Sequence, residues 1–225
     1  MRRVRPSGGH MSAQNPTFCD PFLRALPVSS VAISTLKSPF ETETVCASDS
    51  VAARLDELQI DLGEGPCWTA LRSGAPVLVH DVRHAEHAAW PVLHTAISEY
   101  GLQSVFAFPL IVGTLRIGAV DLYRQTPGPF TSAHATRAQA LADVAALLVL
   151  HRAMDRLPAE EDDPSSSDNP YSRRDIPQAT GMVIEQAKVS ADDALLLIRA
   201  RAFAENQSVR QIAARLIARE ITLSR

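Results

Sequence analysis

Apolar residues follow two different spacings along this chain, and the changes of spacing predict its elements. Short continuous apolar runs, typical of buried strands, occupy residues 28–36, 41–47, 76–79, 104–111 and 116–123. Apolar residues recur every three or four positions, as in helices, over residues 49–62, 66–73, 90–100 and 132–157. A hairpin is expected around Gly113. The pattern predicts an α+β domain with an antiparallel sheet covered on one face.

Residues 171–225 show helical spacing throughout. Ser190 followed by Asp193, and Ser208 followed by Gln211, are capping patterns that each begin a helix. Residues 173–186 are predicted to form the first helix of this part, with regular helical structure expected only after Pro177. Three helices joined by short connections predict a small all-α three-helix bundle.

A segment with five acids, three prolines and no apolar periodicity separates the two parts, over residues 158–170. Such a segment cannot bury side chains, so we expect an exposed linker. The start of the chain is polar and glycine-containing, and Met11 is a candidate for the true initiator besides Met1. The expected division is an unstructured N-terminus over 1–16, a first domain over 17–157, the linker over 158–170 and the bundle over 171–225.

The composition is that of a soluble globular protein, since 46% of the 225 residues are hydrophobic. No apolar run is long enough to cross a bilayer, so we expect a cytoplasmic protein without a membrane partner. The net charge of −3 hides an asymmetry, because residues 171–225 carry 9 Lys and Arg against 6 Asp and Glu. A basic C-terminal end favours a polyanionic partner, although the same residues could simply be solvated.

Three cysteines and a group of histidines are the remaining candidates for chemistry. Cys19, Cys46 and Cys67 are an odd number at wide spacings without a CxxC pair, which favours reduced thiols over a disulfide or a zinc site. Cys67 lies where a helix begins, which could lower its pKa, but a buried structural role is favoured. The histidines lack acidic or Cys partners at ligand spacing, so we expect no metal site at His80, His84, His87 and His94.

One motif in the first domain indicates a family. The run from Asp61 to Cys67 (DLGEGPC), then PVLV at 76–79, Trp90-Pro91, and Ile117-Gly118-Ala119 resemble the GAF sensor domains of actinobacterial regulators. The resemblance implies a domain that binds a small molecule between sheet and loops, or that dimerises. No Cys follows Cys67 to hold a bilin, and the Asn-Lys, Phe and Asp signature of cyclic-nucleotide binding is absent. Ligand and cofactor therefore stay unknown.

The C-terminal helices indicate a second family. Ala179-Thr180-Gly181-Met182, Asp193-Ala194, Arg199 and Asn206 resemble the ANTAR output domain. The resemblance implies binding to RNA stem-loops that prevents a terminator hairpin from forming. Thr180 stands where many ANTAR domains have Lys, which removes a cation that could pair with phosphate.

Arg199 is the first candidate for RNA contact, because a guanidinium pairs with phosphate and stacks on unpaired bases. An ion pair with Asp192 or Glu205 is the alternative. Gly181 inside a helix suggests close approach of another backbone, more often a neighbouring helix than RNA. The further candidates are Thr180, Gly181, Arg173, Arg174, Lys188, Arg210 and Arg215.

We therefore expect a signal-responsive RNA-binding antitermination regulator that is a homodimer and not an enzyme, with no catalytic residues. One alternative is a DNA-binding helix-turn-helix protein with residues 209–219 as recognition helix. Another is a GAF-type thiol reductase that reduces free methionine sulfoxide with its cysteines. The main hypothesis requires that the cationic face of the bundle is neither covered by the rest of the molecule nor neutralised by acidic neighbours.

Overall fold

The computed structural model describes residues 16–36, 40–84, 90–156 and 171–223. The predicted linker over 158–170 lies outside these ranges, as does the predicted unstructured N-terminus up to residue 15. Within the described residues, no helix combines the length and apolar character needed to cross a membrane.

A five-stranded antiparallel sheet forms the centre of the first domain, in the order β2-β1-β5-β4-β3. The strands are β1 (Ser30–Thr35), β2 (Glu43–Ala47), β3 (Val77–Val79), β4 (Ser104–Val112) and β5 (Leu115–Arg124). The predicted hairpin joins β4 to β5, and Gly113 turns the chain with a φ of 60°. The predicted antiparallel α+β domain is confirmed.

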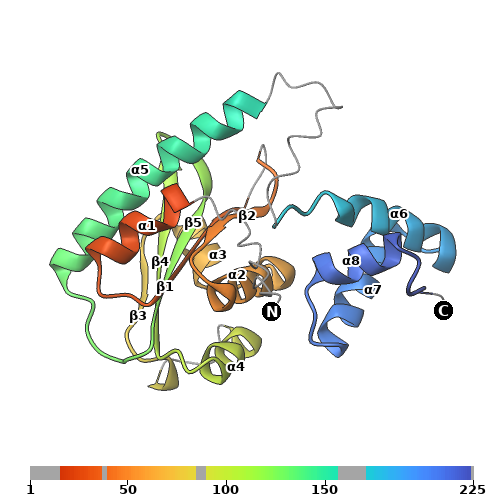
Figure 1. Cartoon of the computed structure of the whole chain (residues 1–225), viewed down its shortest axis with the longest axis horizontal. Helices are drawn as coiled ribbons and strands as arrows, with labels where there is room; N and C mark the ends of the chain where they lie inside the picture. The colour runs from red at the N-terminus through yellow and green to blue at the C-terminus, as the bar shows by residue number, and fades with distance from the viewer. Residues whose placement is uncertain (1–15, 37–39, 85–89, 157–170, 224–225) are drawn as a thin grey trace, which may run out of the picture.

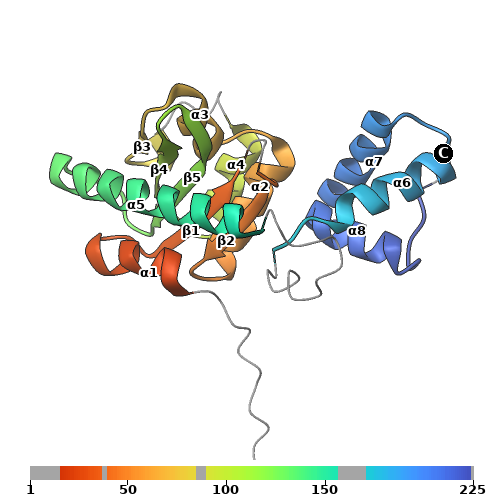
Figure 2. The same cartoon turned by 90° about the horizontal axis from the view of Figure 1, so that it is seen from above.

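Helices cover both faces of this sheet (Figures 1 and 2). One face carries α1 (Pro16–Ala25) and α5 (Ser132–Arg156), and the other carries α2 (Ser50–Leu62), α3 (Pro66–Ser73) and α4 (Pro91–Glu99), with a short 3-10 helix at Val82–His84. The expectation of one covered face is wrong. All six residues of β1 are buried, which requires helices on both sides.

Apolar clusters fill both layers. Phe106, Phe108 and Leu122 lie in the cluster beneath α1 and α5. Leu55 and Tyr123 lie in the cluster on the α2 side. The sheet is therefore the middle layer of a three-layer domain, and α2 is an outer element.

Caps at both ends fix the length of α2. Asp49 accepts hydrogen bonds from the N–H groups of Val51 and Ala52 at 2.9 and 2.8 Å. Gly63 ends the helix in the left-handed conformation, with a φ of 70°. Both signals can be read from the sequence because each acts on neighbouring residues only.

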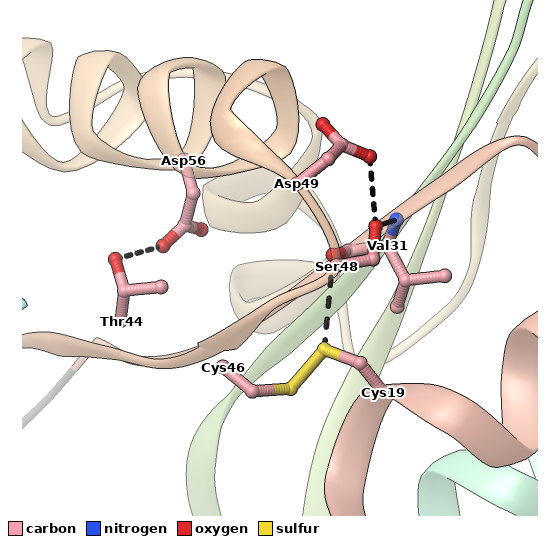
Figure 3. The surroundings of a disulfide bond; sticks show 7 residues. All are labelled: Cys19, Val31, Thr44, Cys46, Ser48, Asp49 and Asp56. Atoms are coloured by element: carbon pink, nitrogen blue, oxygen red, sulfur yellow. Dashed lines mark hydrogen bonds between the residues drawn. A yellow bond between two sulfur atoms is a disulfide. The ribbon is translucent and has the colours of Figure 1, made fainter. Parts of the chain in front are cut away.

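Cys19 and Cys46 form a disulfide that joins α1 to β2 (Figure 3). The expectation of reduced thiols is therefore wrong for this pair. The two Cα atoms lie 6.3 Å apart although 27 positions separate them in the sequence. Sequence spacing could not show this proximity, because it arises from the packing of α1 on the sheet. Cys67 is free and buried.

The second domain is the predicted three-helix bundle of α6 (Asp175–Ala187), α7 (Ala191–Ala204) and α8 (Val209–Ile217). Its core includes Val183, Ile198 and Ile212. Ser190 and Ser208 cap α7 and α8 as expected. The first helix begins before Pro177, because proline is tolerated in the first turn of a helix.

Candidate nucleic-acid interface

Arg199 lies on α7 with its side chain exposed. Within the part of the chain that the structure describes, neither Asp192 nor Glu205 pairs with it, so the alternative of an intramolecular ion pair is not observed. Glu205 instead pairs with Arg201 and Arg215. Arg199 therefore presents its guanidinium to solvent.

Phe203 lies one helical turn after Arg199, on the same side of α7. Its side chain is 69% exposed. A phenylalanine ring this open to solvent is available for contact with a partner. Phe203 was not among the residues predicted from the sequence to contact RNA.

Two other candidate cations contact the first domain. Arg173 donates from Nη2 to Asp61 Oδ1 at 2.5 Å, and Arg210 donates from Nε to Glu57 Oε1 at 2.8 Å. The acceptors are nearly buried, with side chains only 10% exposed in each case. These two cations are therefore neutralised by carboxylates of α2.

The remaining cations also have acidic neighbours. Arg174 pairs with Glu41 of the first domain at 3.4 Å. Lys188 pairs with Glu185 of its own helix, and Arg215 pairs within the bundle as described above. The requirement for a free cationic face is met at Arg199, whereas acidic neighbours neutralise the other candidate cations, Arg173, Arg174, Lys188, Arg210 and Arg215.

Thr180 and Gly181 lie on α6. The Thr180 hydroxyl donates to the carbonyl of Ile176 at 2.8 Å, so it is turned back on its own helix. Gly181 is exposed, and a Cβ built on it meets nothing within 4 Å. The expected packing of a neighbouring helix at Gly181 is therefore wrong, because this position faces away from the bundle core.

A cleft of about 560 Å³ lies between the two domains. Arg199 and Phe203 of α7 line it from one side, and Arg54 and Tyr100 of the first domain line it from the other. Arg54 Nη2 donates to Asn206 Oδ1 at 3.3 Å across the boundary. The cleft combines cations with exposed aromatic rings, which are the groups that bind phosphates and unstacked bases. Sequence analysis did not predict it, because it depends on how the domains meet.

Polar side chains fill the interior of the first domain beneath α2. Gln59 Nε2 donates to Asp121 Oδ2 at 2.6 Å and to Tyr123 Oη at 3.3 Å. The Thr44 hydroxyl donates to Asp56 Oδ2 at 2.5 Å (Figure 3). Burial raises the pKa of Asp56 to about 6 and raises the pKa of Asp121 well above its usual value. The interior therefore holds two carboxyl groups that resist ionisation, and sequence analysis had singled out neither.

Cys67 lies in the first turn of α3, as predicted, but its side chain is completely buried. Burial raises the pKa of Cys67 well above its usual value, and the nearby carboxyl groups of Asp121 and Asp56 add to the effect. A raised thiol pKa opposes formation of the thiolate that redox chemistry needs. The geometry therefore gives no support to Cys67 as a reductase nucleophile.

Those of the four candidate histidines that the structure describes each contact another group of the first domain. His80 Nδ1 faces the backbone N–H of Phe130 at 3.2 Å, and His94 Nε2 faces the carbonyl of Val82 at 2.6 Å. His84 contacts a carboxylate, and His87 lies outside the described residues. Across the described ranges, no three metal-binding side chains gather at one place.

Two solved structures to which this chain is similar are both distant from it in sequence. The GAF domain region of a protein from Geobacter sulfurreducens PCA is 15% identical, with a TM-score of 0.50 over 61% of this chain and 91% of that chain. The type II free methionine-R-sulfoxide reductase from Thermoplasma acidophilum is 19% identical, with a TM-score of 0.45 over 62% of this chain and 92% of that chain. At 15% identity, the similarity to the Geobacter sulfurreducens PCA structure indicates the fold alone. The comparison with curated proteins found no match.

Family profiles match both domains. The GAF domain profile matches residues 20–149, which is more than half of the chain, and the ANTAR domain profile matches residues 170–217. This order is that of a signal-sensing regulator with an RNA-binding output. The chain therefore belongs to the GAF domain family and carries an ANTAR domain after its GAF domain.

Proposed function

We propose that this protein binds paired stem-loops in nascent RNA through its ANTAR domain and thereby prevents termination of transcription. The observation that supports this most is the exposed pair of Arg199 and Phe203 on α7. The protein acts in the cytoplasm, where it meets nascent transcripts, and it makes or breaks no covalent bond. A small molecule sensed by the GAF domain is the trigger.

The pair on α7 offers two kinds of contact that an RNA loop requires. The guanidinium of Arg199 can pair with a phosphate or stack on a base. The ring of Phe203 offers a surface for an unpaired base, a contact worth roughly 1–3 kcal/mol per base. Unpaired bases are available in the apical loops of hairpins and not in regular duplexes.

The exposed outer surface of α5 supports a homodimer. Val144, Leu147 and Leu148 are 55%, 57% and 45% exposed, and Met154 is 58% exposed. Residues 144, 147, 151 and 154 have the spacing of a and d positions in a coiled coil. A second copy of the same helix would bury these apolar groups on both chains at once. Two ANTAR domains in one particle would bind two hairpins with higher avidity.

Fluorescence anisotropy with labelled RNA tests the proposal. The probe is an RNA with two tandem hairpins, compared with a single hairpin and with duplex DNA of equal length at one salt concentration. We expect the two-hairpin RNA to bind most tightly. Equal affinity for duplex DNA would favour a helix-turn-helix protein and contradict the proposal.

Arg199→Ala identifies the surface that binds. It should weaken binding of the two-hairpin RNA about tenfold, since a charged contact and its stacking are lost. Arg24→Ala is the matched control, because Arg24 is an exposed cation on α1 of the GAF domain. Equal affinities of the two variants would show that Arg199 takes no part.

A further inference from the structure

Helix α2 contacts both domains, each through a different face of the helix. Leu55 and Gln59 point into the GAF domain and are completely buried. Arg54, Glu57 and Asp61 follow the spacing i, i+3 and i+7, so they lie along one other stripe of the helix. All three side chains of this stripe bond to the ANTAR domain. One helix therefore connects the interior of the sensor to the surface of the output domain.

Asp61 takes the place that an anion would occupy on the ANTAR domain. Its Oδ1 accepts from Arg173 Nη2 at 2.5 Å, and its Oδ2 accepts from the backbone N–H of Val209 at 2.9 Å. Val209 is the first residue of α8. A guanidinium beside the N-terminal N–H groups of a helix is an arrangement that also suits a phosphate oxygen.

Glu57 makes a parallel contact one turn earlier on α2. Its Oε1 accepts from Arg210 Nε at 2.8 Å. Arg210 follows Val209 on α8, so the two carboxylates of α2 meet adjacent groups at the start of one helix. The side chains of Arg173 and Arg210 are 15% and 30% exposed, so little of either is left for another ligand.

We propose that Glu57 and Asp61 occupy a binding surface for RNA phosphates on the ANTAR domain, so that the GAF domain and RNA compete for Arg173 and Arg210. This inference rests on the proposed function and adds its regulation. Arginine is the side chain best suited to both carboxylate and phosphate, so one site serves either anion. RNA reaches the full surface only when α2 releases the ANTAR domain.

The buried face of α2 can connect a ligand in the GAF domain to the contacts that Glu57 and Asp61 make with the ANTAR domain. Gln59 Nε2 donates hydrogen bonds to Asp121 and Tyr123 of β5, and Gln59 Oε1 accepts a hydrogen bond from the backbone N–H of Cys67. A ligand that rearranged these groups would move the helix that carries Glu57 and Asp61. Sensor occupancy and RNA binding are then linked through one rigid element.

The test compares the full-length double variant Glu57→Gln and Asp61→Asn with the wild-type chain. Both are titrated into the labelled two-hairpin RNA at fixed salt. The double variant should bind at least about tenfold more tightly, because the competing carboxylates are gone and the binding-competent fraction rises. Circular dichroism checks that it is folded, and Asp61→Asn alone replaces it if it is not.

A matched control removes the same number of charges elsewhere. Asp20→Asn with Asp143→Asn lowers the negative charge equally, and both residues are exposed on α1 and α5, away from the ANTAR domain. This control should bind RNA like the wild type. If the variant at 57 and 61 binds no more tightly than this control, the competition is refuted.

The backbone amide of Val209 separates failure of this inference from failure of the proposed function. In nuclear magnetic resonance spectra of the labelled full chain, RNA should shift the signals of Val209 and of α2 together with that of Arg199. Shifts at Arg199 with Val209 and α2 unchanged would refute the competition and leave RNA binding intact. Absence of RNA binding by the wild type and by the double variant would refute the proposed function and this inference together.

Discussion

The buried carboxyl group of Asp56 should make the stability of the GAF domain depend on pH in an unusual direction. Its pKa rises from 3.8 to about 6 in the folded protein, chiefly because burial disfavours the charged form. Between these pH values, the folded chain keeps a proton that the unfolded chain has released. The stability that this group contributes is therefore complete below pH 3.8 and is lost as pH rises toward 6.

The size of the effect follows from the shift. Each pKa unit corresponds to about 1.36 kcal/mol, so ionisation of Asp56 should cost roughly 3 kcal/mol of the free energy of unfolding by neutral pH. Asp56→Asn has nearly the same shape, keeps an acceptor for the Thr44 hydroxyl and cannot ionise. This variant should match the wild type at pH 4 and exceed its stability by up to about 3 kcal/mol at pH 7.5.

Urea denaturation at a series of pH values measures this difference. Asp143→Asn is the control, since it removes one exposed carboxylate from α5. A stability difference between Asp56→Asn and the wild type that stays constant from pH 4 to 7.5 would refute the reasoning. A variant less stable at neutral pH than the wild type would show that the ionised carboxylate is held by favourable contacts instead.

Three further predictions concern the fold and the assembly. Cys46→Ser should lower the free energy of unfolding by about 3.5 kcal/mol relative to the oxidised wild type, because the disulfide to Cys19 closes a loop across 27 positions; equal urea midpoints with and without reductant would contradict this. Gly118→Ala should destabilise the sheet by about 3 kcal/mol or more, since its Cβ would lie 1.8 Å from the carbonyl oxygen of Ser34, and a normal melting temperature would contradict the packing described. Leu147→Lys should convert a dimer into a monomer in light scattering with unchanged circular dichroism, whereas an unchanged mass would exclude α5 as the dimer contact.

Local signals explain why most elements could be predicted from the sequence. Asp49 and Gly63 act on their own helix, and the capping box of Ser208 and Gln211 is complete in the structure. Such signals need no knowledge of distant residues. Helix α1 was missed because Pro21 interrupts its sequence and its apolar face is defined only by the sheet beneath it.

The candidate interface was predicted less completely, because it depends on contacts between residues far apart in sequence. Arg173 and Asp61 are 112 positions apart, and Arg210 and Glu57 are 153 apart. On a single helix, acids at this spacing look like any solvated face. The exposure of Arg199 could be expected from its position on α7, whereas the neutralisation of its neighbours required the three-dimensional arrangement.

The measurement that tests the central claim most directly is the affinity of the full-length wild type and of Arg199→Ala for the two-hairpin RNA over a series of salt concentrations. The account predicts saturable binding that weakens as salt rises, with affinity about tenfold lower and a shallower salt dependence in Arg199→Ala. Absence of saturable RNA binding, or identical curves for the two chains, would contradict it.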